Sequence, residues 1–160
     1  MVQTIANPLD MNNTRVEFTQ SMKENLALGH SSGKVVENWD IPALAGAGAI
    51  RSSTSDLAKF ISANLGYMNS SLMEAMEISH QIRHDKAGGT SIAMAWHINK
   101  GAKGEVICHG GGTGGYRTFI GFVNNKHFSG CCHSFTFPVS QIPFLFSSKI
   151  TLNWYSPASK

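Results

Sequence analysis

The sequence has little of what marks several classes of protein. Lys, Arg, Asp and Glu make up only 14% of the 160 residues, and the net charge of +3 is spread without a block of one sign. No apolar stretch approaches the ~20 residues that cross a bilayer. The first residues, Met-Val-Gln-Thr-Ile-Ala-Asn-Pro, lack the basic and then apolar segments of a secretory signal peptide. These absences argue against nucleic-acid and membrane partners, and the localisation stays unknown.

Cysteine is also scarce. The three cysteines are Cys108, Cys131 and Cys132. An odd count with two adjacent residues suits neither a disulfide framework nor the Cys-x-x-Cys spacing of a metal site. We therefore interpret all three as small apolar side chains within strands.

The first half of the chain predicts loops and then helices. Residues 43–50 form an apolar stretch of very small side chains, which we expect to be buried with another element close to its backbone. Ser53 and Asp56 form a capping-box pattern that begins a helix, and Gly66 is placed to end it. A second, weaker helix is predicted over about 71–82.

The second half predicts strands. Short β-branched or aromatic segments are separated by Asn, Lys and Gly, which is typical of an antiparallel meander. These segments cover 91–98, 105–109, 116–123 and about 129–137, with a hairpin turn at 124–126. Helices followed by a run of strands indicate an α+β fold.

A glycine-rich run, Cys-His-Gly-Gly-Gly-Thr-Gly-Gly-Tyr at 108–116, lies between two predicted strands. A strand that opens into glycines loses conformational entropy and side-chain packing, so something is expected to lie close against its backbone. The run lacks the Lys of a phosphate-binding P-loop, and a strand rather than a helix follows it, which disfavours a dinucleotide site. Backbone N–H groups left uncovered at a strand end instead suit an oxyanion hole.

Several segments together resemble the C-terminal portion of the β-lactamase-related serine hydrolases. They are DIPALAGAGAIRSS at 40–53, DLAKF at 56–60, HGGGTGGYR at 109–117 and FIGF at 119–122. The family includes class C β-lactamases, D-alanyl-D-alanine carboxypeptidases and esterase-like proteins. The resemblance runs in order from about residue 7 to residue 122. It implies the C-terminal part of the β-lactamase/transpeptidase-like fold.

The resemblance assigns the glycine run to the third of three active-site motifs, His-x-Gly. It implies that His109, Gly110 and Gly111 form this motif, and that His109 has a cationic or hydrogen-bonding role. The Gly112 N–H is implied as one half of an oxyanion hole, the nucleophile's own N–H being the other. Two further residues, Thr113 and Tyr116, are candidates for substrate binding, although cross-strand packing is an equal alternative for the tyrosine.

The other two motifs, Ser-x-x-Lys and Tyr-x-Asn, are expected upstream of the matching segment. Residues 31–34, Ser-Ser-Gly-Lys, fit the first as a string, but Gly33 before two valines predicts a turn instead of the required helix. Residues 67–69, Tyr-Met-Asn, match the second motif as a string. Because they directly follow the helix end at Gly66, we interpret this match as a coincidence. We expect the chain to lack the nucleophile and to be inactive alone. The resemblance implies no metal and no organic cofactor.

The remaining histidines and the end of the chain give little more. His80 and His84 are spaced as in a zinc helix, but without its glutamate we expect solvent-exposed side chains. After Phe122 the resemblance fails. A one-base shift in the codons for residues 130–134 would permit Val-Val-Val-Ile-Leu, so we hypothesise a frameshift from about Val123 onward.

The best interpretation is a truncated β-lactamase-like serine hydrolase with a single partial domain over 1–160. Its predicted parts are loop-rich 1–50, helical 53–85, antiparallel strands over 91–137 and an irregular tail over 138–160. The parent reaction would form an acyl-enzyme from a small-molecule or peptide substrate: a β-lactam, a D-Ala peptide or an ester.

The alternative is a non-catalytic binding module or one half of a split protein that needs an upstream partner chain. A Ser-x-x-Lys motif in the neighbouring reading frame would favour the hydrolase, whereas an independent small domain would fold as a monomer without a partner.

Overall fold

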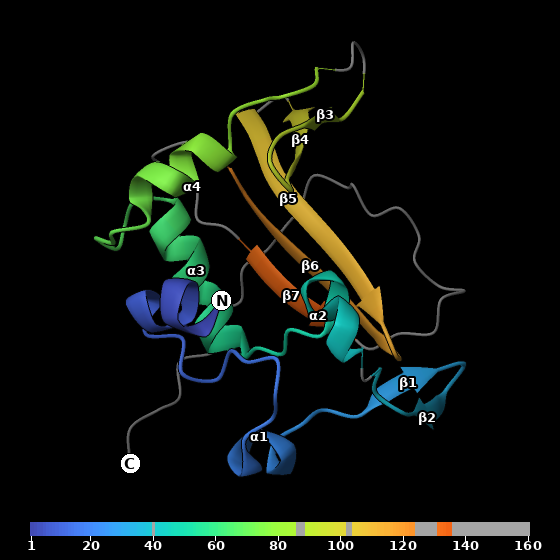
Figure 1. Ribbon diagram of the computed structural model, residues 1–160. Coiled ribbons are helices and arrows are strands. Elements are labelled where there is room, and N and C mark those ends of the chain that lie inside the picture. The colour runs from blue at the N-terminus through green and yellow to red at the C-terminus, as the bar shows by residue number, and fades with distance from the viewer. Residues whose placement is uncertain (40, 86–88, 102–103, 124–130, 136–160) are drawn as a thin grey trace, which may run out of the picture.

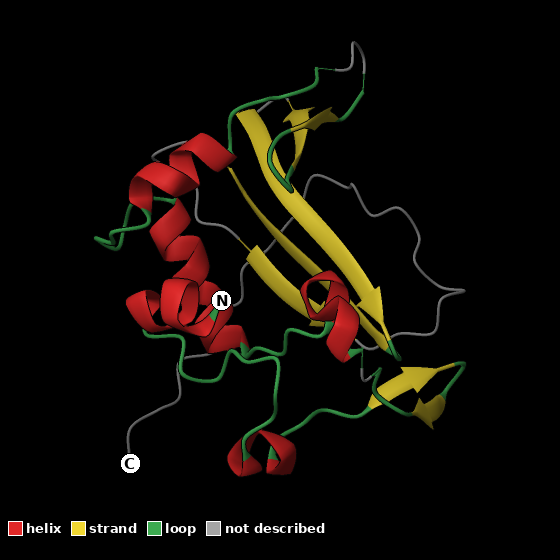
Figure 2. Ribbon diagram, viewed as in Figure 1, coloured by secondary structure: helices red, strands yellow, loops and turns green. Residues whose placement is uncertain are grey.

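The computed structural model describes residues 1–39, 41–85, 89–101, 104–123 and 131–135. Within these ranges helices lie on one side of an antiparallel sheet (Figures 1 and 2). The helical elements are the π-helix η1 (Val2–Ala6), the 3-10 helices η2 (Asn7–Leu9) and η3 (Pro42–Leu44), and the α-helices α1 (Gln20–Glu24), α2 (Ala45–Gly48), α3 (Thr54–Asn64) and α4 (Met73–Ser79). This arrangement agrees with the predicted α+β class.

The strands form two sheets. A small hairpin pairs β1 (Gly29–Ser31) with β2 (Lys34–Val36). The main sheet has the order β3-β4-β5-β6-β7, with every neighbouring pair antiparallel. Its strands are β3 (Ser91–Ile92), β4 (His97–Gly101), β5 (Gly104–Thr113), β6 (Tyr116–Val123) and β7 (Cys131–Phe135).

The most strongly predicted helix is confirmed. The Ser53 side chain accepts a hydrogen bond from the Asp56 amide at 3.2 Å, which satisfies one of the free N–H groups of the first turn of α3. After the helix, Gly66 has φ +73°, the left-handed conformation that its lack of Cβ permits. The second predicted helix is α4, which at Met73–Ser79 is shorter than the expected 71–82.

Two strand predictions need correction. The segment expected to be one strand over 91–98 is divided into β3 and β4, because Ala95 between them has a positive φ of 59°. The strand expected to end at 109 continues through the glycines to Thr113, where pairing with β6 holds glycine backbone extended despite its low strand propensity.

The apolar face of α3 joins two parts of the core. Ile61 packs with side chains of the sheet, which include Trp96, Ile107 and Phe122. On the adjacent side, Ala63 packs with the N-terminal turns and α4 through a second cluster, which contains Ala6, Leu9, Met11 and Met76. The helix therefore anchors both the sheet and the N-terminal segment.

The small-residue stretch at 43–50 is only partly as expected. Ala49 is buried, and a Cβ added to Gly48 would lie 2.8 Å from Thr113 Cγ2, so α2 does approach β5 closely. Leu44 and Ile50, however, are 65% and 47% exposed. The expectation of burial is wrong for these two side chains and also for Ala43, Gly46 and Ala47, which are exposed as well, because no described element covers them.

Some predictions fall outside the described residues: the hairpin turn at 124–126 and the tail over 138–160. The strand predicted near 129–137 is present as β7. Among the helices that the structure describes, none has the length and apolar character needed to span a membrane.

Candidate active site

The predicted catalytic residues His109–Gly112 lie on β5, in the half of the strand that pairs with β6 but not with β4. Strand β4 pairs with β5 only as far as His97↔Cys108. Ala95, two residues before His97 in the sequence, has a positive φ, and there the chain turns away from β5. Figure 1 shows β3 and β4 flanking only the first half of the long strand β5. Within the described ranges, no strand pairs with residues 109–113 on the β4 side. We call this part of β5 the open edge.

The hairpin that joins β5 to β6 decides which amides face the open edge. Its two-residue turn closes on the pair Thr113↔Tyr116, and the residues that flank a two-residue hairpin turn are expected to form a hydrogen-bonded pair. Because bonding alternates along an antiparallel strand, His109, Gly111 and Thr113 bond to β6. The N–H and C=O of Gly110 and Gly112 consequently point the other way, to the open edge. The Gly112 N–H is thus oriented as an oxyanion donor would have to be.

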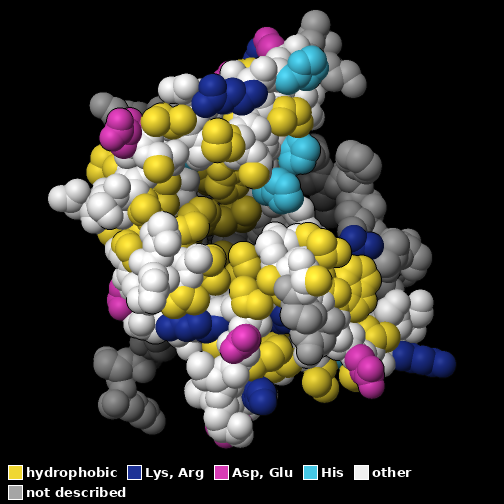
Figure 3. All heavy atoms as spheres, in the orientation of Figure 1, with side chains coloured by type: hydrophobic (Ala, Val, Ile, Leu, Met, Phe, Trp, Pro, Cys, Tyr) yellow, Lys and Arg dark blue, Asp and Glu magenta, His cyan; other side chains and the backbone are white. Residues whose placement is uncertain are grey.

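The His109 side chain lies on the helix-bearing face of the sheet. It is two residues after Ile107, which is buried against α3, and side chains two apart share a face. His109 itself is exposed, and its ring stacks on that of His97 with 5.4 Å between centroids and 23° between planes. In Figure 3, two histidine side chains lie together beside a hollow in the middle of this view. Sequence reasoning missed His97, because its proximity depends on where β4 ends.

The two predicted substrate-binding residues are engaged within the fold. Thr113 is half-buried and packs against α2 at Gly48. The Tyr116 hydroxyl donates to the Ala27 carbonyl oxygen at 2.6 Å and lies 2.7 Å from the Asn38 side-chain oxygen. These contacts give both side chains a packing role, and their contact with a substrate stays a prediction.

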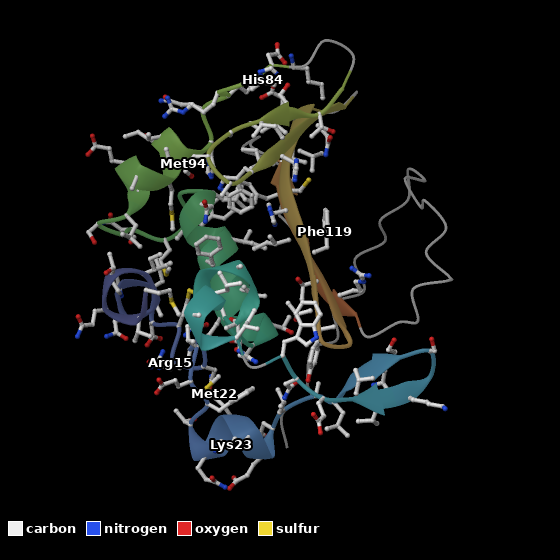
Figure 4. The ribbon with its side chains drawn as sticks, turned by 45° about the vertical axis from the view of Figure 1, so that its right-hand side comes forward. Arg15, Met22, Lys23, His84, Met94 and Phe119 are labelled. Atoms are coloured by element: carbon white, nitrogen blue, oxygen red, sulfur yellow. The ribbon has the colours of Figure 1, made fainter. Side chains whose placement is uncertain are left out.

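The opposite face of the sheet carries an open hollow of about 570 Å³, lined in part by Ile92, Gly110 and Phe119. Figure 4 shows Phe119 projecting on the side of the sheet turned away from the helices. Cys108 also lines this hollow, and burial raises the pKa of its thiol, although a hydrogen bond from Asn99 Nδ2 at 3.3 Å opposes the shift. This buried cysteine agrees with the prediction of a small apolar side chain.

The two short sequences that match the upstream motifs do not have the local structure that those motifs require. Ser31 and Lys34 face each other across the β1–β2 turn, so they do not share a helix. Tyr67 is 62% exposed in the loop between α3 and α4. Both observations agree with the sequence interpretation that neither string is an active-site motif.

The prediction of exposed histidines is right for His84 and wrong for His80. The His80 ring packs edge-on against Trp96 and Phe122, and its Nε2 lies 2.9 Å from the Asn64 side-chain oxygen. Burial lowers the pKa of His80, and the nearby Glu77 carboxylate partly opposes this. No cluster of three or more His, Cys, Asp or Glu that could hold a metal ion exists among the described residues.

Comparisons with known proteins establish the family and the fold of the chain. A family model described as Beta-lactamase matches residues 1–139. The match extends past Phe122, where the sequence resemblance was expected to fail. Among curated proteins, no sequence matches this chain.

Solved structures with the same fold include a class C beta-lactamase, with 19% identity and a TM-score of 0.77 over 86% of this chain and 45% of that chain. D-alanine Carboxypeptidase AmpC from Burkholderia cenocepacia has 21% identity and a TM-score of 0.70 over 79% of this chain and 46% of that chain. Beta-Lactamase/D-Alanine Carboxypeptidase from Pseudomonas syringae has 19% identity and a TM-score of 0.68, over 79% and 44% respectively. The chain therefore spans less than half the length of these structures, and at such identities the likeness shows the fold.

Proposed function

Because the chain belongs to the beta-lactamase family, we propose that it supplies the third-motif strand of a serine hydrolase site. The proposed reaction passes through an acyl-enzyme formed from a β-lactam, a D-Ala peptide or an ester. The nucleophile would come from polypeptide outside these 160 residues, since neither candidate string within them has the geometry of Ser-x-x-Lys. The observation that carries the proposal is the open edge of β5.

In the proposed reaction the lysine of Ser-x-x-Lys takes the proton of the serine hydroxyl as its Oγ attacks the substrate carbonyl carbon, and the new Oγ–C bond moves an electron pair onto the carbonyl oxygen. The Gly112 N–H donates a hydrogen bond to this oxygen, and the His109 ring, three residues earlier on β5, helps to stabilise the developing charge. The carbonyl then re-forms as the C–N or C–O bond breaks, and the departing group takes up the proton that the base removed from the serine. Water afterwards hydrolyses the acyl-enzyme and regenerates the serine. No metal or organic cofactor is needed in this scheme.

Exposed apolar side chains around α2 and the β1–β2 hairpin favour a companion polypeptide for the site. Leu28, Val35, Trp39 and Leu44 are each more than half exposed, at 59%, 57%, 54% and 65%. Large exposed apolar side chains in one region commonly mark an interaction surface. The partner in this proposal is the segment that carries Ser-x-x-Lys, on the same or a separate chain.

The test is complementation. The 160-residue chain is expected to show no turnover of nitrocefin or p-nitrophenyl acetate alone. Co-expressed with the polypeptide encoded immediately upstream, it should allow a fluorescent penicillin to label the serine of that polypeptide. His109→Ala should lower the labelling rate by about 10²-fold, the effect typical of losing one oxyanion or electrostatic donor.

His30→Ala serves as the matched control, because the His30 ring bonds only to the Leu28 carbonyl among the described residues. It should leave labelling unchanged. Turnover by the chain alone would contradict the proposal, as would labelling of the upstream polypeptide that is indifferent to His109→Ala.

A further inference from the structure

The His97 and His109 rings meet at the open edge of β5. Their centroids are 5.4 Å apart and their planes differ by 23°, which is within the range of stacked aromatic pairs. His97 pairs with Cys108, the residue before His109, so the two histidine side chains start from opposite faces of the sheet. Such rings can touch only where no further strand separates them, and β4 does not extend past His97 on this side. The contact therefore depends on where β4 stops.

The backbone of His97 is held firmly in the sheet. It pairs with Ile92 of β3 on one side and with Cys108 of β5 on the other. Its two neighbours in the chain are buried, since Trp96 is 8% exposed and Ile98 is 1% exposed. The His97 side chain is itself exposed, but it extends from a well-anchored part of the core.

The His109 ring, in contrast, has little support from its own strand. It is exposed, and Gly110 and Gly111 follow it, so the next position on its face has no side chain. Ile120 lies opposite His109 on β6, on the side away from the open edge. Among the described residues, His97 supplies the aromatic contact at the open edge.

We propose that His97 is a positioning residue, which holds the His109 imidazole in one rotamer at the open edge by stacking on it. The inference rests on the proposed function and deepens it, because the His109 ring has to lie where charge develops on the carbonyl oxygen. An aromatic pair of this kind favours one rotamer by about 2- to 12-fold. An imidazole spread over three staggered rotamers would occupy the productive one about a third of the time. His97 thus acts through His109 without touching the substrate.

The first experiment measures the χ1 rotamer of His109 in the full 160-residue chain by NMR, from three-bond couplings between its backbone and its Cγ. The wild type should show the couplings of a single rotamer. His97→Ala should shift them to averaged values, whereas His97→Phe keeps an aromatic ring and should match the wild type. His84→Ala is the matched control, because His84 is also exposed but lies beyond β3, where it bridges to Ile92 (Figure 4). It should leave the couplings unchanged.

The second experiment measures the rate at which the fluorescent penicillin labels the upstream serine in the co-expressed complex. His97→Ala should slow labelling about threefold, in line with the loss of one preferred rotamer, and His97→Phe should restore the rate. In a chain that already carries His109→Ala, His97→Ala should cause no further loss. A merely structural role of His97 would slow labelling in both backgrounds.

Averaged couplings in the wild type, a single rotamer retained in His97→Ala, or a further loss in the His109→Ala chain would overturn the inference. If His97→Ala loses its dispersed spectrum, the couplings of the wild type and of His97→Phe decide. The rotamer measurement requires no acylation, so the inference fails on the couplings, whereas the proposed function fails on the labelling of the unmutated complex.

Discussion

The backbone amide of His30 donates a hydrogen bond to the carbonyl oxygen of Gly115 at 3.0 Å, which ties the β1–β2 hairpin to the β5–β6 turn. The glycine run thus serves two purposes. Its second part, Gly114 and Gly115, makes room for the protein's own backbone, at Glu37 and Trp39 as well as at His30. In its first part, a Cβ added at Gly111 or Gly112 would instead meet the side chains of Thr118 and Arg117 on β6, so these glycines make room for side chains of the neighbouring strand.

Gly115→Ala should destabilise the fold strongly. Gly115 has φ +81°, and an added Cβ would lie 2.5 Å from His30 N and 2.7 Å from Gly29 C, both of them backbone atoms. We expect a loss of about 3 kcal/mol in the free energy of unfolding, measured by urea denaturation. Gly66→Ala is the control, because Gly66 also has a positive φ, +73°, but nothing within 4 Å of an added Cβ. It should cost only about 1 kcal/mol, the left-handed backbone penalty alone. Equal losses would contradict the assigned contact between the two hairpins.

Asp56 should be a large contributor to stability. Its carboxylate is 2% exposed and accepts hydrogen bonds at 2.8 Å from the Asn13 amide and the Thr14 hydroxyl. Asp56→Ala leaves these donors unsatisfied and should lower the free energy of unfolding by about 2–4 kcal/mol. The exposed neighbour Ser55 provides the control, since Ser55→Ala should change stability by less than about 0.5 kcal/mol. A similar effect of both variants in thermal or urea unfolding would refute the role of Asp56.

Acidification should destabilise the fold through His80. Burial lowers the pKa of His80 from its ordinary 6.5, so the folded chain binds fewer protons there than the unfolded chain does. Stability from this residue is complete above about pH 6.5 and is lost as the pH falls from that value through the folded pKa. His80→Gln should flatten the slope of unfolding free energy against pH in this window. An unchanged slope would show that other groups govern the acid sensitivity.

Cys108 should be protected from alkylation in the folded chain. Burial of this side chain raises the pKa of its thiol, and alkylation proceeds through the accessible thiolate. At pH 8, iodoacetamide should modify the Cys108 peptide at least tenfold more slowly in the folded chain than in urea, as read by mass spectrometry. Rapid modification without denaturant would mean that this part of the β4–β5 pairing opens readily.

The elements predicted most accurately are those set by local chemistry. Ser53 and Gly66 specify the ends of α3 through a side-chain cap and a left-handed glycine, both of which depend only on neighbouring residues. The predictions that failed concern features that depend on contacts between segments far apart in the sequence. The extension of β5 to Thr113 depends on pairing with β6. Leu44 is exposed because no described element packs against its side chain. The burial of His80 depends on Trp96 and Phe122, which reach it only in the tertiary structure.

By itself the sequence determined where the candidate site is and what chemical groups it offers: one imidazole at His109 followed by glycine amides. It could do so because a His-Gly-Gly-Gly run can be recognised in the sequence without knowing which strands pair with it. Only the tertiary structure decided which amides are free, since this depends on where β4 ends at His97 and on the alternation set by the Gly114–Gly115 turn. It also decided that Arg117 lies over Gly112, because that contact follows from the register between two strands, which no single segment encodes.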